Sequence, residues 1–416
     1  MTRYISSLSL VLLLAGFLLL FLGHRAIRAL LQNDEYGIQK QEEEQEDVLK
    51  LRYSLVEASA VGNLERVKRL IEDKELSANI VDPIGRSPLR ASLESGHIAI
   101  TNYLLKHGAT VNDIDLEGNS ALMLSVRYNR VEPFLQLLEK GAELNHRSPI
   151  GRTALYEAAL SGNYMMVDKL LAAGADVNGL DIFGNTIIHA AVLSKNVPVL
   201  RKVIATLVDL DIKNKSGITP LGLAVSHQLV PQVRVLLENT ATVWLKDIDG
   251  ENILTQAVRS DELRKDIQMK EVNKVISLSQ QRVADEMDDI KLQDLKRTQV
   301  IVALLLAGND NKAELVNSRD KESRTPLMYA VLNGNFLVVE QLIKAGANIN
   351  MQDAAGMSAL HLATQAGYTV IIEDLLAAGA DLDIRNKQGR TPVQLAQDLG
   401  LREVEKTLTR QAQEAQ

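Results

Sequence analysis

The chain contains no cysteine and few aromatic residues. Among its 416 residues Cys is absent, and Phe, Trp and Tyr together make up only 4%. The absence of Cys excludes disulfides, thiol nucleophiles, Cys-ligated zinc sites and a lipid-modified N-terminal Cys. With so few rings, a core must be built mainly from Leu, Val, Ile and Ala, as in stacked short helices.

An excess of positive charge is also missing. The formal net charge is −7, whereas a surface that binds nucleic acid is basic, so nucleic acid is not expected as the main ligand. Apolar residues make up 46% and charged residues 24%, which is typical of a folded rather than a disordered chain. The length exceeds that of an ordinary compact domain, unless the fold grows by repetition.

Long uncharged apolar runs are absent except at the N-terminus. Residues 5–22 carry no charge and would span roughly 27 Å as a helix, close to the hydrocarbon thickness of about 30 Å. Cleavage after Gly23 would place Phe21 where a signal peptidase prefers a small residue. We therefore predict a retained transmembrane anchor over residues 1–23, with membrane contact through 5–22. A cleaved signal peptide is the alternative.

The charges around this segment bear on its orientation. Arg25 and Arg28 follow it directly, which favours a cytoplasmic C-terminal part, at the inner or plasma membrane if the source is bacterial. Because Arg3 precedes the segment, a periplasmic or otherwise extracytoplasmic location is the alternative. Residues 24–50 include the acidic run 39–47, and we expect them to form an acidic juxtamembrane linker.

Glycine recurs with a fixed period through most of the chain. The series steps by 33 residues, and it resumes after a gap of 73, which is one period plus 40. Its members are Gly85, Gly118, Gly151, Gly184, Gly217, Gly250, Ser323, Gly356 and Gly389. This period predicts a helix-turn-helix unit with a loop, and one unit that carries an insertion.

Each period contains the same start and stop signals for helices. Thr153 and Thr325 precede apolar segments, and Thr is a good N-cap because its hydroxyl accepts from free backbone N–H groups. A second apolar segment contains the pair Leu170-Leu171 and ends at Gly174, which suits a left-handed C-cap. The pattern predicts two short helices per unit.

Residues 151–178 and 356–383 closely resemble ankyrin repeats. The resemblance covers about residues 51–410, with a cap at 51–81, repeats that start near 82, 115, 148, 181, 214, 247, 320 and 353, a second cap at 386–410 and a polar tail at 411–416. It implies an all-α solenoid of antiparallel helix pairs, in which each repeat contacts only its neighbours. It also implies that the hairpin-like loops and the first helices form a concave face that binds proteins.

The sequence contains no recognisable catalytic, metal-binding or phosphate-binding motif. The seven His residues form no H-E-x-x-H motif, and no phosphate-binding loop is present, so we predict no enzyme, no catalytic residue, no cofactor and no metal ligand. By resemblance, His189 and His361 occupy the His position of the family's T-P-L-H signature. That position implies that they join loop backbone through hydrogen bonds.

The repeat pattern breaks in several successive places. Leu207 and Thr240 replace the C-cap glycine, so we expect the helix ends there to be remodelled. Trp244 replaces the loop Asn, either as an interface anchor or as a cover over the altered helix end. Residues 261–299 form an insertion without Pro or Gly, which predicts a helical extension of both helices of its repeat. About five further residues are added in the loop 308–320.

The loop tips carry apolar residues where the family usually has variable, exposed positions. They are Ile84, Ile114, Leu116, Ile150, Leu180, Ile182, Phe183, Ile218 and Ile248. Such a row indicates either a contact strip or side chains tucked between loops. For a partner-binding surface we select Ile150, Arg152, Ile182, Phe183, Tyr128, Ile218, Trp244 and Arg259.

The sequence thus favours a membrane-tethered ankyrin scaffold that binds another protein without catalysis. A neutralising, immunity-type protein or a host-directed effector, which binds a toxin, an enzyme or a host protein, is the alternative reading. The insertion at 261–299 is either a solvated excursion or an arm that contacts a partner, the membrane surface or a second copy, the last giving self-association.

Overall fold

The computed structural model describes residues 50–51, 53–259, 289–307 and 312–414. The chain divides into two units, one ending at Ala142 and the other beginning at Glu143. Both consist of helices joined by turns and loops, and the described residues contain no β-strand, only two isolated β-bridges. The predicted anchor and most of the predicted linker lie outside the described residues.

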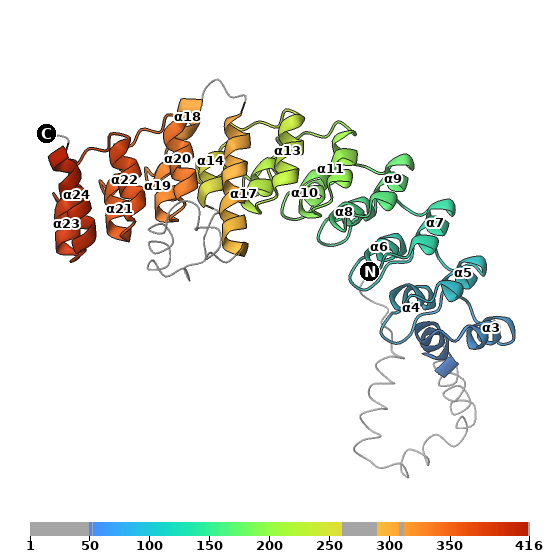
Figure 1. Ribbon diagram of the computed structural model, residues 1–416. Helices are drawn as coiled ribbons and strands as arrows, with labels where there is room; N and C mark the ends of the chain where they lie inside the picture. Colours follow the sequence, from blue (N-terminus) through green and yellow to red (C-terminus); the bar gives the residue numbers. More distant parts are fainter. Residues whose placement is uncertain (1–49, 52, 260–288, 308–311, 415–416) are drawn as a thin grey trace, which may run out of the picture. The chain divides into compact units, whose positions relative to one another are not determined.

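The first unit contains a helical segment at 53–61 and five further helices. These are α3 (Leu64–Glu72), α4 (Pro88–Ser95), α5 (Ile98–Lys106), α6 (Ala121–Arg127) and α7 (Val131–Glu139). Each repeat contributes a first helix and a second helix, which lie side by side (Figure 1). The fold of this unit is therefore a stack of helix pairs.

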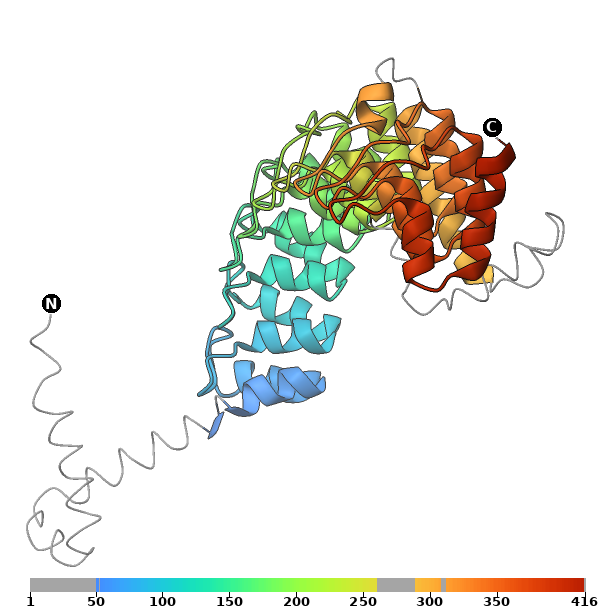
Figure 2. The same cartoon turned by 90° about the vertical axis from the view of Figure 1, so that its left-hand side faces the viewer.

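The second unit continues the same alternation of first and second helices (Figures 1 and 2). Its elements are α8 (Ala154–Leu160), α9 (Tyr164–Ala172), α10 (Ile187–Leu193), α11 (Val197–Ile204), α12 (Pro220–Ser226), α13 (Val230–Glu238), α14 (Ile253–Arg259), α17 (Asp289–Leu306), α18 (Lys312–Val316), α19 (Pro326–Leu332), α20 (Phe336–Lys344), α21 (Ala359–Ala366), α22 (Thr369–Ala377), α23 (Pro392–Asp398) and α24 (Arg402–Glu414). The expectation of an all-helical ankyrin solenoid is confirmed for these residues.

The helix start signals act as the sequence predicts. The Thr153 hydroxyl accepts from the Tyr156 N–H at 3.2 Å, and the Thr325 hydroxyl accepts from the Met328 N–H at 3.3 Å. In the second helices an Asn takes this role, and Asn163 accepts from the Met166 N–H at 3.1 Å. Each cap satisfies a backbone donor that the helix itself leaves without a partner.

The core lies between the helices and is built from small and branched side chains. Ala158, Ala159, Ala190 and Ala191 are completely buried in the first helices, where the lack of bulk lets neighbouring helices approach. Leu170 in α9 is also completely buried. Burial of one such Leu contributes roughly 2 kcal/mol, so the stack is held mainly by contacts between neighbouring helices.

The repeat register continues across the insertion. The Asn252 side chain donates to the Leu315 carbonyl oxygen at 2.9 Å, and the Asn333 side chain donates to the Val258 carbonyl oxygen at 2.7 Å. The first bond joins the two ends of the repeat that contains α14, across the insertion. The second joins this repeat to the one that contains α19. The 40 extra residues therefore leave the packing of the next repeat intact.

The insertion agrees with the prediction in one helix of its repeat. The second helix, α17, has 18 residues, twice the nine of α9, so its extension is observed. The first helix, α14, is described only to Arg259, and residues 260–288 lie outside the described part of the chain. The extra residues at 308–320 include the short helix α18, which the sequence analysis treated as loop. Leu315 and Val316 are buried, which explains why this turn is ordered.

The expectation of remodelled helix ends at Leu207 and Thr240 is wrong for the backbone conformation. Both residues keep the left-handed conformation of the glycine they replace, with φ of 60° and 67°. At Thr240 the following N–H, of Ala241, still donates to the Leu236 carbonyl oxygen at 3.1 Å, as in the regular repeats. The packing of neighbouring repeats imposes the backbone shape even where the side chain disfavours it.

Among the residues that the structure describes, no helix combines the length and the apolar character needed to cross a membrane. The predicted anchor at residues 5–22 lies outside the described residues and stays a prediction.

Candidate protein-binding surface

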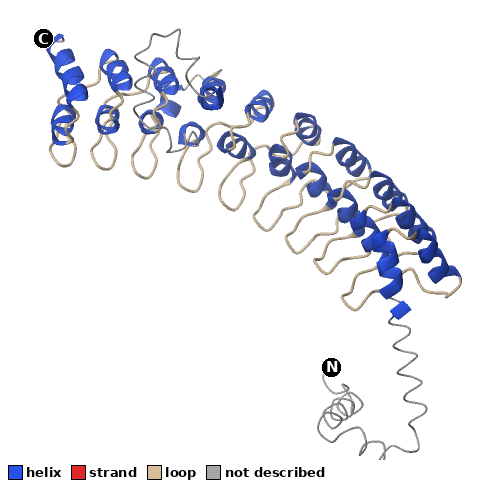
Figure 3. Cartoon of the chain, turned by 60° about the horizontal axis from the view of Figure 1, so that its bottom comes forward, coloured by secondary structure: helices blue, strands red, loops and turns tan. Residues whose placement is uncertain are grey.

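Each loop of the second unit is held by a polar side chain at its base. The Asp181 carboxylate accepts from the backbone N–H groups of Phe183 at 2.9 Å and Asn185 at 2.8 Å. Asp353 accepts from Ala355 and Met357 in the same way, at 2.8 Å and 2.9 Å. These bonds bend each loop into a tight hairpin that projects from the helices, as Figure 3 shows for the tan loops.

Neighbouring loops in the second unit are joined to each other by backbone hydrogen bonds at their tips. The N–H of Ile182 donates to the Ile150 carbonyl oxygen at 3.0 Å, and the N–H of Lys215 donates to the Phe183 carbonyl oxygen at 2.9 Å. After the insertion the same type of bond recurs. The N–H of Ala354 donates to the Glu322 carbonyl oxygen at 2.8 Å, and the N–H of Lys387 donates to the Ala355 carbonyl oxygen at 3.1 Å. The tips therefore form ordered rows rather than independent flexible loops.

Side chains in the loops add a second set of links. The Arg147 guanidinium donates to the carbonyl oxygen of Leu180, one loop further on. The Lys213 ammonium donates to the Lys246 carbonyl oxygen at 2.6 Å. Arg147 and Lys213 are thus engaged in loop structure, which explains the cations at this repeat position.

Asparagine links neighbouring repeats at the opposite end of several loops. The side-chain oxygen of Asn145 accepts from the Asp176 N–H at 2.9 Å, and that of Asn350 accepts from the Asp381 N–H at 2.9 Å. These bonds between repeats were not predicted from the sequence. The signal for them was the 33-residue spacing of the asparagines, which places each one against the next repeat.

The predicted apolar tips of the second unit are mostly exposed. Ile182 is 46% exposed and Phe183 59%, and Ile150, Leu180 and Ile248 also face solvent. Ile218 is only half-buried, and its carbonyl oxygen accepts from His189 at 3.1 Å. The structure therefore brings Ile150, Ile182 and Phe183 together on two bonded loops, whereas Ile218 belongs more to the loop base.

The tips of the first unit are exposed as well. Ile84, Ile114 and Leu116 all face solvent, and Leu116 lies against the loop glycine Gly85. Tyr128, which closes α6 in this unit, is 39% exposed, and the Arg130 guanidinium lies 5.9 Å from the centre of its ring.

Arg152 lies beside the apolar tips of the second unit, in a small cluster of polar side chains. Its guanidinium is 5.2 Å from the centre of the Tyr156 ring and 3.6 Å from the Glu157 carboxylate. The Tyr156 hydroxyl donates to Asp181 at 3.0 Å. Burial, together with the negative charge of Asp181, raises the pKa of Tyr156, so this hydroxyl stays protonated. Arg152 is thus partly exposed and held in place, which suits a contact residue.

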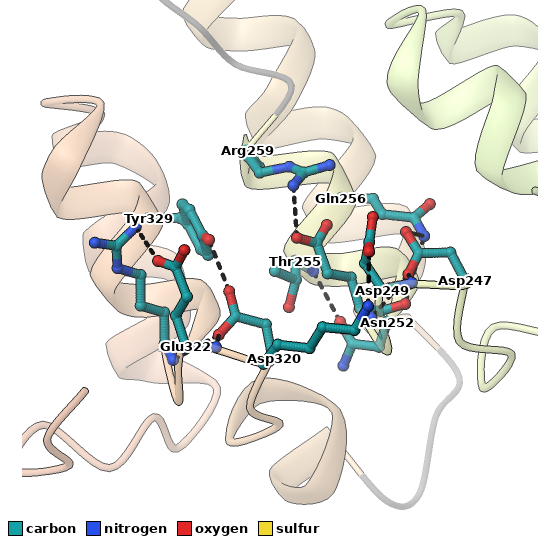
Figure 4. Close-up of polar contacts among 12 residues, drawn as sticks. Asp247, Asp249, Asn252, Thr255, Gln256, Arg259, Asp320, Glu322 and Tyr329 are labelled. Atoms are coloured by element: carbon teal, nitrogen blue, oxygen red, sulfur yellow. Dashed lines mark hydrogen bonds and ion pairs between the residues drawn. The ribbon is translucent and has the colours of Figure 1, made fainter. Parts of the chain in front are cut away.

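Arg259 lies beside a cluster of acidic residues that includes Asp247, Glu251 and Asp320 (Figure 4). These residues come from the repeats on both sides of the insertion. Its guanidinium pairs with the Glu251 carboxylate at 2.6 Å, and Glu251 is 4% exposed. Burial raises the pKa of Glu251, Arg259 lowers it, and Asp247 and Asp320 raise it further. Arg259 is therefore the main counter-charge for a buried carboxylate, although half of its side chain remains exposed.

Trp244 is the remaining predicted contact residue. Its side chain is 39% exposed, at the loop position that carries Asn145 three repeats earlier and Asn317 in the next repeat. An indole ring has no acceptor oxygen, so Trp244 is unable to make the asparagine link described above.

His189 and His361 have the roles that the resemblance implies. Each forms a capping box with the preceding Thr186 or Ser358, and the other ring nitrogen of each bonds a carbonyl oxygen of the next loop, of Ile218 at 3.1 Å and Arg390 at 3.0 Å. Burial lowers the pKa of both residues. Neutral imidazole is required here, because one ring nitrogen accepts while the other donates.

The comparison with protein-family models agrees with this architecture. The family model for ankyrin repeats (3 copies) matches residues 55–148, 136–206, 155–247, 295–353 and 333–415, which together cover more than half of the chain. The crystal structure of the human ASB11 ankyrin repeat domain is similar over 62% of this chain and 98% of its own length, at 23% identity and a TM-score of 0.48. A probable palmitoyltransferase, AKR2 of Saccharomyces uvarum, is 41% identical over 54 residues.

The match to the palmitoyltransferase covers 13% of this chain and 7% of that protein, so it reflects a short repeat segment. The ankyrin fold is typically a non-catalytic module for protein interaction. The periodic loops, the capped helix pairs and the family matches along most of the chain lead to one assignment. The chain belongs to the ankyrin repeat family.

Proposed function

We propose that this protein is a membrane-tethered scaffold that binds a partner protein through the loops and first helices of its second unit. The observation that carries this proposal is the pair of bonded loops with Ile150, Ile182 and Phe183 at their tips. Exposed apolar side chains on a rigid backbone can bury surface against a partner without paying the entropy of ordering a loop. Arg152 supplies a fixed cation beside them, and Arg is a favoured residue type at interfaces.

Binding through this surface is tested by charge substitution. The variant Ile182→Asp with Phe183→Asp should abolish co-purification of the partner from native membranes, measured by quantitative mass spectrometry. Both side chains are about half exposed, so the urea midpoint should change little. Leu399→Asp is a matched control, because Leu399 is 49% exposed in the turn before α24, outside the proposed surface. Equal binding by both variants would exclude the tips as the contact site.

Tethering is a separate part of the proposal. It is supported by the uncharged segment 5–22 and by Arg25 and Arg28 directly after it. Removal of residues 1–24 should move the protein from the membrane to the soluble fraction and leave its helical circular dichroism unchanged. A reporter fused to the C-terminus then distinguishes the cytoplasmic from the extracytoplasmic location.

A further inference from the structure

Seven non-glycine residues of the described chain have a positive φ, and all of them occupy glycine positions of the repeat. They are Glu75, Asn129, Lys195, Leu207, Gln228, Thr240 and Ser323. Regular repeats place glycine at these positions, as Gly162 and Gly174 illustrate with φ of 72° and 88°. The left-handed region is unfavourable for residues with a Cβ, and most unfavourable for β-branched ones such as Thr240.

Four of the seven are concentrated in two consecutive repeats. Lys195 and Gln228 occupy the turn between first and second helix, and Leu207 and Thr240 occupy the end of the second helix. None of the four is Asn or Asp, the residue types that tolerate this conformation best. Within residues 181–246, each of the two repeats therefore has a strained backbone at both turns where a regular repeat has glycine.

The helix end at Leu207 also lacks bonds that other repeats make. In the regular repeats the N–H after the C-cap residue donates back into the helix, as from Ala175 to Leu170 at 3.0 Å. No such bond joins Val208 to Val203, although both lie in the described part of the chain. In the same repeat α11 has eight residues, whereas α9 has nine.

The link to the preceding repeat is missing at the same place. Asn145 and Asn350 each accept from a backbone N–H 31 residues later, at 2.9 Å in both cases. Within the described residues, Asn178 makes no corresponding bond to the Asp209 N–H. The side chain of Leu207 itself is 93% exposed, so it contributes almost no packing in return for its strained backbone.

We propose that residues 181–246 are a built-in opening point, at which the second unit unfolds locally before the repeats on either side. In a solenoid each repeat is stabilised only by its own contacts and by those to its neighbours. Two successive repeats with strained turns, the first of which also lacks bonds at its helix end, therefore open at a lower free energy than the global unfolding. The segment begins at the tip with Ile182 and Phe183 and ends just before the tip with Ile248, so its opening changes the spacing of these tips.

Hydrogen exchange of the free full-length protein, followed by mass spectrometry, tests this proposal directly. Amides in α11 and α13 should exchange at least tenfold faster than those in α9 and α20, which are also second helices. Equal protection of all four helices would overturn the proposal. The opening is a property of the free chain, so its failure would leave the proposed function standing.

Glycine substitution tests the cause. The variant with Lys195→Gly, Leu207→Gly, Gln228→Gly and Thr240→Gly should slow exchange in α11 and α13 at least tenfold, without slowing it in α20. Ser323→Gly is the matched control, because it relieves the same strain in a distant loop and should leave α11 and α13 unchanged. Leu207→Gly alone should slow α11 by a smaller factor. Unchanged exchange in both glycine variants would refute strain as the origin of the opening.

Discussion

The tip glycines give the sharpest test of how the loops are assembled. Gly184 and Gly174 both have a left-handed backbone, with φ of 77° and 88°. They differ in their surroundings, because a Cβ atom on Gly184 would lie 2.9 Å from the backbone nitrogen of Lys215 in the next loop. A Cβ atom on Gly174 would meet nothing within 4 Å. Alanine at the two positions therefore separates backbone strain from steric conflict between loops.

The expected magnitudes differ by a factor of two or more. Gly174→Ala should cost about 1 kcal/mol of unfolding free energy, since only the positive φ disfavours alanine. Gly184→Ala carries the same strain and in addition forces the two loops apart, which typically costs about 1–3 kcal/mol. It also disturbs the bond from the Lys215 N–H to the Phe183 carbonyl oxygen, which contributes about 1 kcal/mol. The total for Gly184→Ala is therefore about 3–5 kcal/mol.

Urea denaturation, monitored by circular dichroism at the helical band, measures both losses. The wild type, Gly174→Ala and Gly184→Ala should show midpoints in descending order, and the larger step should fall at Gly184. Equal midpoints for the two variants would refute the close contact between tips, and with it the interpretation of the loops as a rigid row.

Three further outcomes follow from the polar contacts. Replacement of His189 and His361 by Gln, which the last repeat carries at this position, should reduce the loss of stability on acidification. The pKa of both His residues is lower in the folded than in the unfolded state, so their contribution to the free energy of unfolding is complete above the unfolded pKa of about 6.5 and declines as the pH falls below it. Urea midpoints at pH 7.5 and 5.5 measure this difference. Arg259→Ala should destabilise the fold by about 1–3 kcal/mol because Glu251 loses its main counter-charge, and the same substitution in a Glu251→Gln background should cost clearly less in a double-mutant cycle. Asn350→Ala should cost about 1–2 kcal/mol by urea titration, because it removes two bonds to the next repeat.

The periodic parts of this protein were predictable from the sequence because each repeat carries its own local signals. Thr153 and Thr325 cap first helices, and Gly174 ends a second helix, in the places that the 33-residue period predicts. The roles of His189 and His361 followed from the family resemblance. The position of Ile182 and Phe183 at a loop tip was also predicted, whereas the sequence left open whether their side chains are exposed or tucked between loops.

The departures from the period were harder to predict. From the sequence alone we expect remodelled helix ends at Leu207 and Thr240, because a side chain disfavours a positive φ. The structure keeps the left-handed backbone at both residues. It also folds residues 312–316 into α18, where the sequence suggested only a longer loop. In these places neighbouring repeats override the local preference, as contacts distant in sequence commonly do.

The sequence by itself determined the repeat unit, its helix boundaries and the family, since caps, glycines and apolar pairs act within a few residues of one another. Only the tertiary structure decided how one loop meets the next. The bond from Ile182 to Ile150, the space available at Gly184 and the pairing of Arg259 with Glu251 depend on distances between groups that local signals do not encode. The binding surface proposed here is a property of stacked repeats, because a single loop has no neighbour to hold its tip in place.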